Sequence, residues 1–100
     1  MSISQRQLER HIRDAAKDTA NVHVKRKHTV ARMNERGITR AMIYEVLRLG
    51  VMDRPPEPDP KFPGVRCRMR RYVSGMDVGV VIYVNHPEPD LIVITVIDID

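Results

Sequence analysis

A histidine and two arginines stand four residues apart in the first half of the chain. They are His28, Arg32 and Arg36, and Gly37 follows the last of them directly. Residues four apart lie on one face of a helix, so these three side chains would project side by side as a basic ridge. Guanidinium groups hold phosphate oxygens through charge-assisted hydrogen bonds, and imidazole titrates near neutral pH. The spacing therefore indicates phosphate chemistry.

A second set of polar and aromatic residues would share one face of a sheet. Apolar and polar residues alternate from Val65 to Val73, the period of a strand, although Arg71 interrupts the apolar side. The set consists of Arg66, Arg68, Arg70, Tyr72, Tyr83 and Thr95. Interleaved arginines and tyrosines suit RNA, because guanidinium contacts phosphate while the rings stack on bases. An ordinary solvent-facing sheet is the structural alternative.

These residues would supply the groups that metal-independent RNA cleavage requires. The reaction needs activation of the 2′-hydroxyl, protonation of the leaving oxygen and positive charge at the phosphate. His28 is the acid–base candidate, Arg32 would hold the phosphate, and Tyr83 would stack on a base or donate a proton. We therefore predict His28, Arg32 and Tyr83 as catalytic, and Arg36 with the remaining sheet residues as RNA-binding.

No metal or other cofactor is expected. The single cysteine, Cys67, excludes an internal disulfide and a multi-cysteine zinc site, and it is expected to face the core. No two histidines have the four-residue spacing of a helical metal site, and no glycine-rich phosphate loop is present.

The charges are unevenly distributed along the chain. Residues 1–54 hold twelve Lys and Arg against six Asp and Glu, and every charged residue after Tyr72 is acidic. One positive end favours a polyanionic partner such as RNA, although a solvated basic face would have the same composition. No apolar run reaches the roughly 20 residues of a membrane span, and no signal peptide is evident, so we expect a cytoplasmic protein without membrane contact.

The first half of the chain predicts helices. Ser4 and Gln7 have the form of a capping box that opens a helix of about four turns. A short extended segment at residues 21–25 precedes the ridge helix, which Gly37 would end. Thr39 would cap a third helix that stops at Gly50. Its buried stripe would consist of Met42, Ile43, Val46, Leu47 and Leu49.

The second half predicts a proline-rich loop and then strands. Residues 55–64 contain five prolines and are expected to form a loop. A hairpin with Gly75 and Met76 at its centre, in a type II′ turn, would place Arg68 opposite Tyr83. A third strand, apolar on both faces, would follow over residues 91–99. The expected fold is a single α+β domain over residues 1–100, with helices packed on one face of an antiparallel three- to four-stranded meander.

The order of these features resembles a bacterial family catalogued as domain of unknown function 4258. The resemblance rests on His28, Arg32, Met33 and the run 36–39 (Arg-Gly-Ile-Thr), followed by an apolar helix, Gly50, a variable loop and a hydrophobic hairpin. It covers about residues 22–98 and leaves residues 1–20 as an accessory helix. The family is similar in its plan to the RelE and BrnT toxins, small ribonucleases of toxin–antitoxin modules. The resemblance therefore implies a RelE-like fold, RNA as substrate or ligand, and an acidic antitoxin protein that covers the basic face.

Two other functions remain open from the sequence. The second and third helices, joined through Gly37, also resemble a helix-turn-helix, in which Arg40, Tyr44 and Arg48 would contact DNA. A non-catalytic interaction or adaptor domain would keep the fold without the chemistry. In either case the free edge of the meander would be able to pair with a partner strand or with a second copy as a homodimer.

Overall fold

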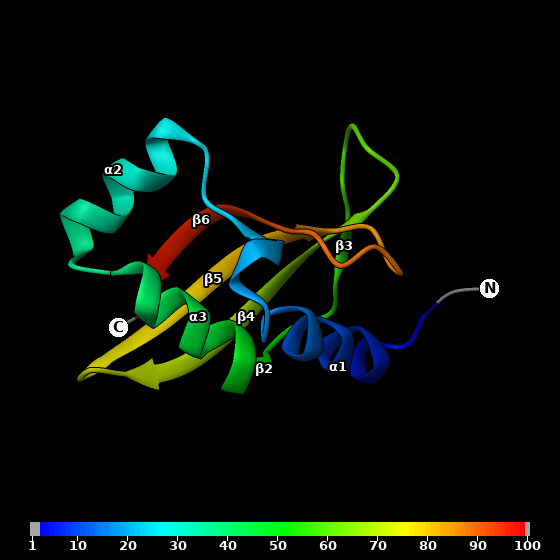
Figure 1. The fold of residues 1–100 in the computed structure, drawn as a ribbon, viewed down its shortest axis with the longest axis horizontal. Coiled ribbons are helices and arrows are strands. Elements are labelled where there is room, and N and C mark those ends of the chain that lie inside the picture. Colours follow the sequence, from blue (N-terminus) through cyan, green and yellow to red (C-terminus); the bar gives the residue numbers. More distant parts are fainter. Residues whose placement is uncertain (1–2, 100) are drawn as a thin grey trace.

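The computed structural model describes residues 3–99, which form an α+β fold with the helices ahead of the long strands (Figure 1). The elements are α1 (Gln5–Ala15), β1 (Val22–His23), α2 (Lys27–Arg36), α3 (Arg40–Leu49), β2 (Val51–Met52), β3 (Glu57–Pro58), β4 (Val65–Val73), β5 (Met76–Val84) and β6 (Leu91–Asp98). A short 3-10 turn, Thr19–Asn21, connects α1 to β1. The α+β class and the helix-first order are as predicted.

The sheet is larger than predicted. Strands β4, β5 and β6 form the expected antiparallel meander, but six strands are present instead of three or four. The sheet is also mixed, because β1 pairs in parallel with β6. Strands β2 and β3 pair with two different stretches of β4 along one edge. The three additional strands have two residues each, too few to show a periodic pattern, and Pro58 is tolerated because β3 lies at the edge.

The β4–β5 turn differs from the prediction. Its central residues are Ser74 and Gly75, with φ of 51° and 79°, so both occupy the left-handed region of a type I′ turn. The register is therefore shifted by two residues, and Arg68 faces Val81 instead of Tyr83. A shift of two leaves every side chain on its predicted face, because successive side chains alternate between faces.

The three helices begin and end largely where the capping residues predict. The Ser4 capping box opens α1, Gly37 ends α2 with φ of 67°, and Thr39 caps α3. Helix α1 has 11 residues, about three turns instead of four. Leu49, predicted to be buried, is 55% exposed. It lies about 90° around α3 from the centre of the buried stripe, at the last helical residue.

The helices cover the sheet unequally. Helices α1 and α3 lie on one face (Figure 1), where they bury the β5 residues Val78, Val80, Ile82 and Val84 in a common apolar core. The opposite face carries the polar residues of β4 and is called the open face below. Helix α2 packs along β6 beyond the short β1, so it covers an edge that would otherwise be free. No helix among residues 3–99 is long and apolar enough to cross a bilayer.

Candidate nucleic-acid interface

Three of the predicted RNA-binding arginines form a row on β4, and each contacts a carboxylate from another segment. The Nε–Oδ1 distances are 2.8 Å for Arg66–Asp59, 2.9 Å for Arg68–Asp53 and 2.9 Å for Arg70–Asp77. Arg68 and Arg70 also bind the second oxygen of their carboxylate, which gives the bidentate geometry of strong ion pairs. The three positive charges are thus matched by three negative charges. The alternation along β4 placed the arginines correctly but did not indicate their acidic partners.

The arginines hold these carboxyl groups in their ionised form. The hydrogen bond from Arg66 lowers the pKa of Asp59 to about 2, and the N–H groups of Lys61 and Phe62 contribute to this shift. The hydrogen bond from Arg68 likewise lowers the pKa of Asp53. At neutral pH each carboxylate therefore stays charged and keeps its guanidinium occupied.

The other two candidates on the open face, Tyr72 and Thr95, take no part in these ion pairs. Tyr72 is 70% exposed near the tip of the β4–β5 hairpin. Thr95 is half-buried opposite Val81, and its hydroxyl donates a long hydrogen bond of 3.5 Å to the carbonyl of Val96. Tyr72 lies directly opposite Asp77, the partner of Arg70, in the β4–β5 register.

The predicted ridge on α2 is divided by the packing of the helix. Thr29 and Met33 form the buried face of α2. His28 and Arg32 are exposed, and the described part of the chain offers them no hydrogen bond or ion pair. Arg36 is half-buried, and its Nε is buried without a hydrogen-bond partner among the described residues. The helical spacing thus predicted the exposed pair correctly, whereas Arg36 lies seven residues after Thr29 and turns towards the interior.

Tyr83 lies at a pocket of about 330 Å³ that is built by the N-cap of α2, the proline-rich loop and strands β4, β5 and β6. Its charged and aromatic lining consists of Arg26, Asp59, Lys61, Phe62, Arg66 and Tyr83, beside the apolar Ile92 and Ile94. The rings of Phe62 and Tyr83 meet edge to face, with centroids 6.1 Å apart. The Tyr83 hydroxyl accepts a hydrogen bond of 3.0 Å from the Gly64 N–H, which orients the ring and leaves the phenolic proton free. We call this site the nucleotide pocket, after the ligand proposed for it below.

The proline-rich loop presents Phe62 to this pocket. Asp59 Oδ2 accepts hydrogen bonds from the N–H groups of Lys61 and Phe62, both at 2.9 Å, while its other oxygen binds Arg66. Gly64 then packs so closely on Tyr83 that an added Cβ would lie 2.7 Å from the ring. These contacts tie both sides of the loop to the sheet and leave the Phe62 side chain 56% exposed.

The start of α2 adjoins the nucleotide pocket and is unusual for a helix N-terminus. Its N-cap is Arg26, which makes no side-chain capping bond, and the first turn contains no acidic residue. Lys27 and His28 follow instead. A helix start normally favours Ser, Thr, Asp or Asn caps and acidic side chains, because its free N–H groups carry partial positive charge. An anionic ligand would satisfy both the N–H groups and the basic side chains.

Four charged or aromatic residues of the nucleotide pocket were missed from the sequence, namely Arg26, Asp59, Lys61 and Phe62. Phe62 is the only phenylalanine in the chain, and it stands next to Lys61 in a loop that has no core to fill. Arg26 occupies a position where a capping residue is normally found. Both signals are visible in the sequence, but their meeting beside Tyr83 depends on the fold.

Cys67 is buried in the core as predicted, and burial raises the pKa of its thiol to about 12. Within residues 3–99, no three His, Cys, Asp or Glu side chains are grouped so that they could hold a metal ion.

Comparison with known proteins identifies one family. No curated protein and no solved structure matches this chain. A family model described as a domain of unknown function (DUF4258) matches residues 26–98. The match begins at Arg26 and includes all residues of the nucleotide pocket, whereas α1 and β1 precede it. Because it covers well over half of the sequence, the chain belongs to the DUF4258 family.

Proposed function

We propose that this protein binds single-stranded RNA, with one base in the nucleotide pocket and the adjoining phosphate at the start of α2. The observation that carries the proposal is the meeting of two aromatic rings with the cationic side chains of Arg26 and Lys61 in one open pocket. The nucleotide pocket has the size of small-ligand sites, which begin at about 300 Å³. Unpaired bases are free to stack on aromatic rings, whereas bases within a duplex are not.

The α2 residues extend this proposal to RNA cleavage without a metal. His28 follows Arg26 by two residues, so their Cα atoms lie within about 7 Å of each other. The 2′-oxygen would attack phosphorus and the bond to the 5′-oxygen would break. His28 would accept the 2′-proton, and the Tyr83 hydroxyl or a water molecule would donate a proton to the leaving oxygen. Arg32, exposed and without an ion pair in the described structure, would stabilise the charge that develops on the phosphate.

The helix-then-meander order supports a toxin-type role. Helices followed by an antiparallel meander are also the order that the resemblance to the RelE and BrnT toxins implies, although the sheet here is mixed and has six strands. An acidic antitoxin segment would be a suitable inhibitor, because it would match the charge of the basic start of α2.

Binding is tested by fluorescence anisotropy with a labelled single-stranded RNA oligonucleotide. Loss of one stacking ring costs about 1–3 kcal/mol, so Phe62→Ala should weaken binding roughly 5- to 150-fold. Leu49→Ala is the control, since it removes an exposed apolar side chain that lies outside the nucleotide pocket. Equal affinities of wild type and Phe62→Ala would contradict the nucleotide pocket.

Cleavage is tested separately on a gel and by RNA integrity after controlled expression in cells. His28→Ala should retain RNA binding and lose cleavage and growth arrest. If RNA stays intact with the wild-type protein, the protein binds RNA without cleaving it. Binding to duplex DNA that Arg40→Ala abolishes would instead support the helix-turn-helix reading.

A further inference from the structure

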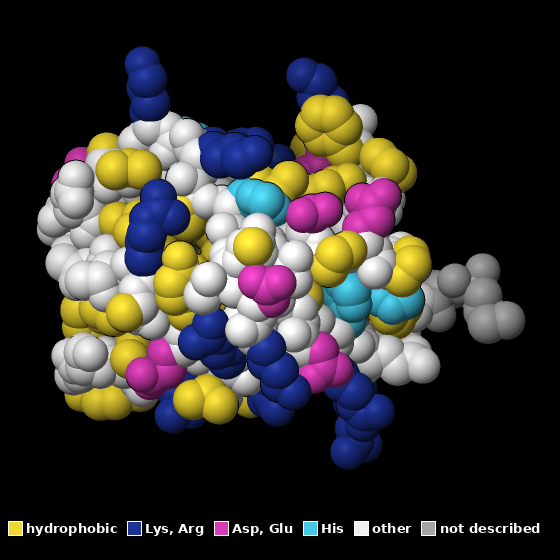
Figure 2. Space-filling model, in the orientation of Figure 1, with side chains coloured by type: hydrophobic (Ala, Val, Ile, Leu, Met, Phe, Trp, Pro, Cys, Tyr) yellow, Lys and Arg dark blue, Asp and Glu magenta, His cyan; other side chains and the backbone are white. Residues whose placement is uncertain are grey.

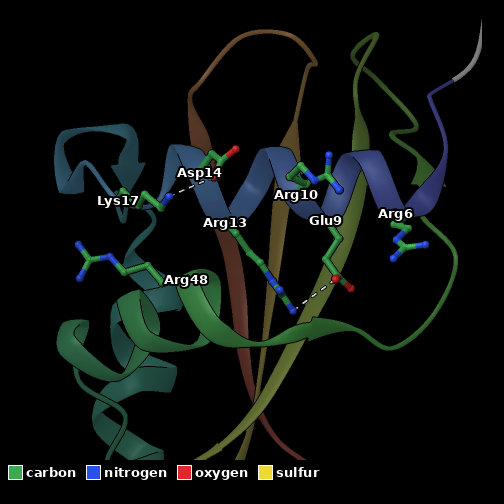
Figure 3. A pocket seen from close by; sticks show the side chains of 7 residues that line it. All are labelled: Arg6, Glu9, Arg10, Arg13, Asp14, Lys17 and Arg48. Atoms are coloured by element: carbon green, nitrogen blue, oxygen red, sulfur yellow. Dashed lines mark ion pairs between the residues drawn. The ribbon is translucent and has the colours of Figure 1, made fainter.

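A second basic surface lies on the helix-covered side of the sheet. Figure 2 shows Lys and Arg side chains gathered where α1 and the end of α3 meet the edge of the molecule. A cleft of about 550 Å³ lies there between the two helices (Figure 3). Its cationic lining consists of Arg6, Arg10, Arg13, Lys17 and Arg48. Only two acidic side chains, Glu9 and Asp14, also line this α1–α3 cleft, so its formal charge is +3.

The spacing of the α1 residues aligns their charges. Arg6, Arg10 and Arg13 follow each other at intervals of four and three, and therefore share one side of the helix over about 10 Å. Glu9 pairs with Arg13 at 3.3 Å. Arg6 and Arg10 have no ion pair within the described part of the chain, so their guanidinium groups are available for a ligand.

Two further guanidinium groups are held in place by the backbone. Arg13 of α1 donates from Nε and Nη2 to the carbonyl of Gly50, which ends α3, at 3.0 and 2.7 Å. Arg48 of α3 donates in return from Nε to the carbonyl of Ala16, which ends α1, at 2.7 Å. Each arginine thus caps the negative end of the other helix. A guanidinium fixed in this way loses little further freedom when one of its remaining N–H groups binds a phosphate.

We propose that the α1–α3 cleft binds the phosphate backbone of RNA without regard to base sequence. All of its lining side chains are charged, so among the described residues the cleft offers no ring to stack on a base and no apolar side chain to anchor an acidic protein helix. Phosphate oxygens suit such a surface, because Arg forks bind them bidentately. The inference rests on the proposed function in one respect, namely that the polyanion is RNA. The cleft and the nucleotide pocket lie on opposite sides of the sheet, so each can be tested separately.

The cleft also lies mainly on a segment outside the family match. Helix α1 precedes residue 26, where the match begins, and only Arg48 comes from within it. Three residues of α1 nevertheless belong to the main core, namely Leu8, Ile12 and Ala15, and so does the C-cap Ala16. The helix is therefore a rigid support for added charge.

The test measures the salt dependence of RNA binding by the full-length protein. Labelled poly(U) and poly(A) oligonucleotides are titrated at several salt concentrations with wild type and with Arg6→Ala/Arg10→Ala. Losing two phosphate contacts should reduce the slope of log K against log salt by about 1.4 and weaken both oligonucleotides equally. Arg54→Glu is the matched control, because it changes the net charge by the same amount at an exposed residue outside the cleft.

The outcomes separate the cleft from the nucleotide pocket. The Arg6 and Arg10 substitutions are also combined with Phe62→Ala. If Phe62→Ala alone keeps salt-dependent RNA binding and the added substitutions remove it, the cleft is supported even if the nucleotide pocket does not bind RNA. Unchanged slopes in Arg6→Ala/Arg10→Ala, with wild-type binding intact, would overturn the cleft and leave the nucleotide pocket standing. Poly-glutamate is also added as a competitor at equal charge concentration. If it displaces RNA only when Arg6 and Arg10 are present, the cleft binds an acidic protein and the inference is overturned.

Discussion

Replacement of Thr29 tests how α2, which carries His28 and Arg32, is held against the sheet. Thr29 is fully buried, and its hydroxyl donates a 2.7 Å hydrogen bond to the carbonyl of Ile94. The β5–β6 register is irregular at this point, since Val81 pairs with Thr95 and the next residue pairs with Val93, which leaves Ile94 without a partner on β5. On the other side, β1 pairs only with residues 91 and 92. The threonine hydroxyl therefore supplies the partner that the sheet does not.

The expected cost follows from this geometry. Thr29→Val keeps the shape of the side chain but leaves the Ile94 carbonyl buried and unpaired, which costs about 1–3 kcal/mol of the free energy of unfolding. Thr29→Ser keeps the hydroxyl and removes one methyl group, at about 0.8 kcal/mol before any cavity effect. We therefore expect the valine variant to lose about 2 kcal/mol, a roughly 30-fold change in the ratio of folded to unfolded protein, and to lose more than the serine variant.

Urea unfolding followed by circular dichroism measures both variants, since the chain contains no tryptophan. Amide hydrogen exchange in α2 is measured in parallel, because local detachment of the helix would escape a global unfolding probe. The reasoning is refuted if the valine variant is as stable as wild type in both measurements, or if the serine variant loses more stability than the valine variant.

Three further predictions follow from single positions. An added Cβ at Gly50 would meet two backbone carbonyl oxygens at 2.4 and 2.7 Å, whereas at Gly37 it would meet nothing within 4 Å and only the φ of 67° is unfavourable. Gly50→Ala should therefore lower the urea midpoint more than Gly37→Ala, for which the left-handed backbone implies a loss of about 1 kcal/mol; the reverse order would contradict the packing. The Arg66 contact lowers the pKa of Asp59 to about 2, so its stabilisation is present above the unfolded pKa near 4 and is lost as the pH falls through 2. The thermal midpoint of Asp59→Asn should thus lie below wild type at pH 7 and match it near pH 2, and a constant difference would show that Asp59 acts otherwise. Burial raises the pKa of Cys67 to about 12, so its thiol should react with a disulfide reagent at pH 8 only after urea unfolding, and rapid labelling of the native protein would refute its burial.

Local patterns accounted for the helices and for the faces of the long strands. Capping residues such as Ser4, Thr39 and Gly37 mark helix ends because they satisfy N–H groups or adopt a left-handed φ within a few residues of themselves. Alternation along β4, which Arg71 interrupts, likewise placed Cys67 inside and Arg66, Arg68 and Arg70 outside. Such signals act between near neighbours, so they are readable without the fold.

Local signals did not predict the register of the β4–β5 hairpin or the presence of the two-residue strands. The type I′ turn at Ser74 and Gly75 and the type II′ turn at Gly75 and Met76 both keep the same side chains on the same faces, so the hydrophobic pattern does not distinguish them. Strands of two residues carry no period, and their existence depends on which edge the rest of the chain leaves free.

The sequence by itself determined the types of residue that can do chemistry here, namely exposed His28 and Arg32 on one helix and a row of arginines on one strand. Only the tertiary structure decided which cations are available. Asp53, Asp59 and Asp77 arrive at the β4 arginines from other segments, while Arg26, Phe62 and Tyr83 meet from three separate segments. Ion pairing and pocket formation depend on distances between segments far apart in the chain, and chain folding, not spacing along the sequence, sets those distances.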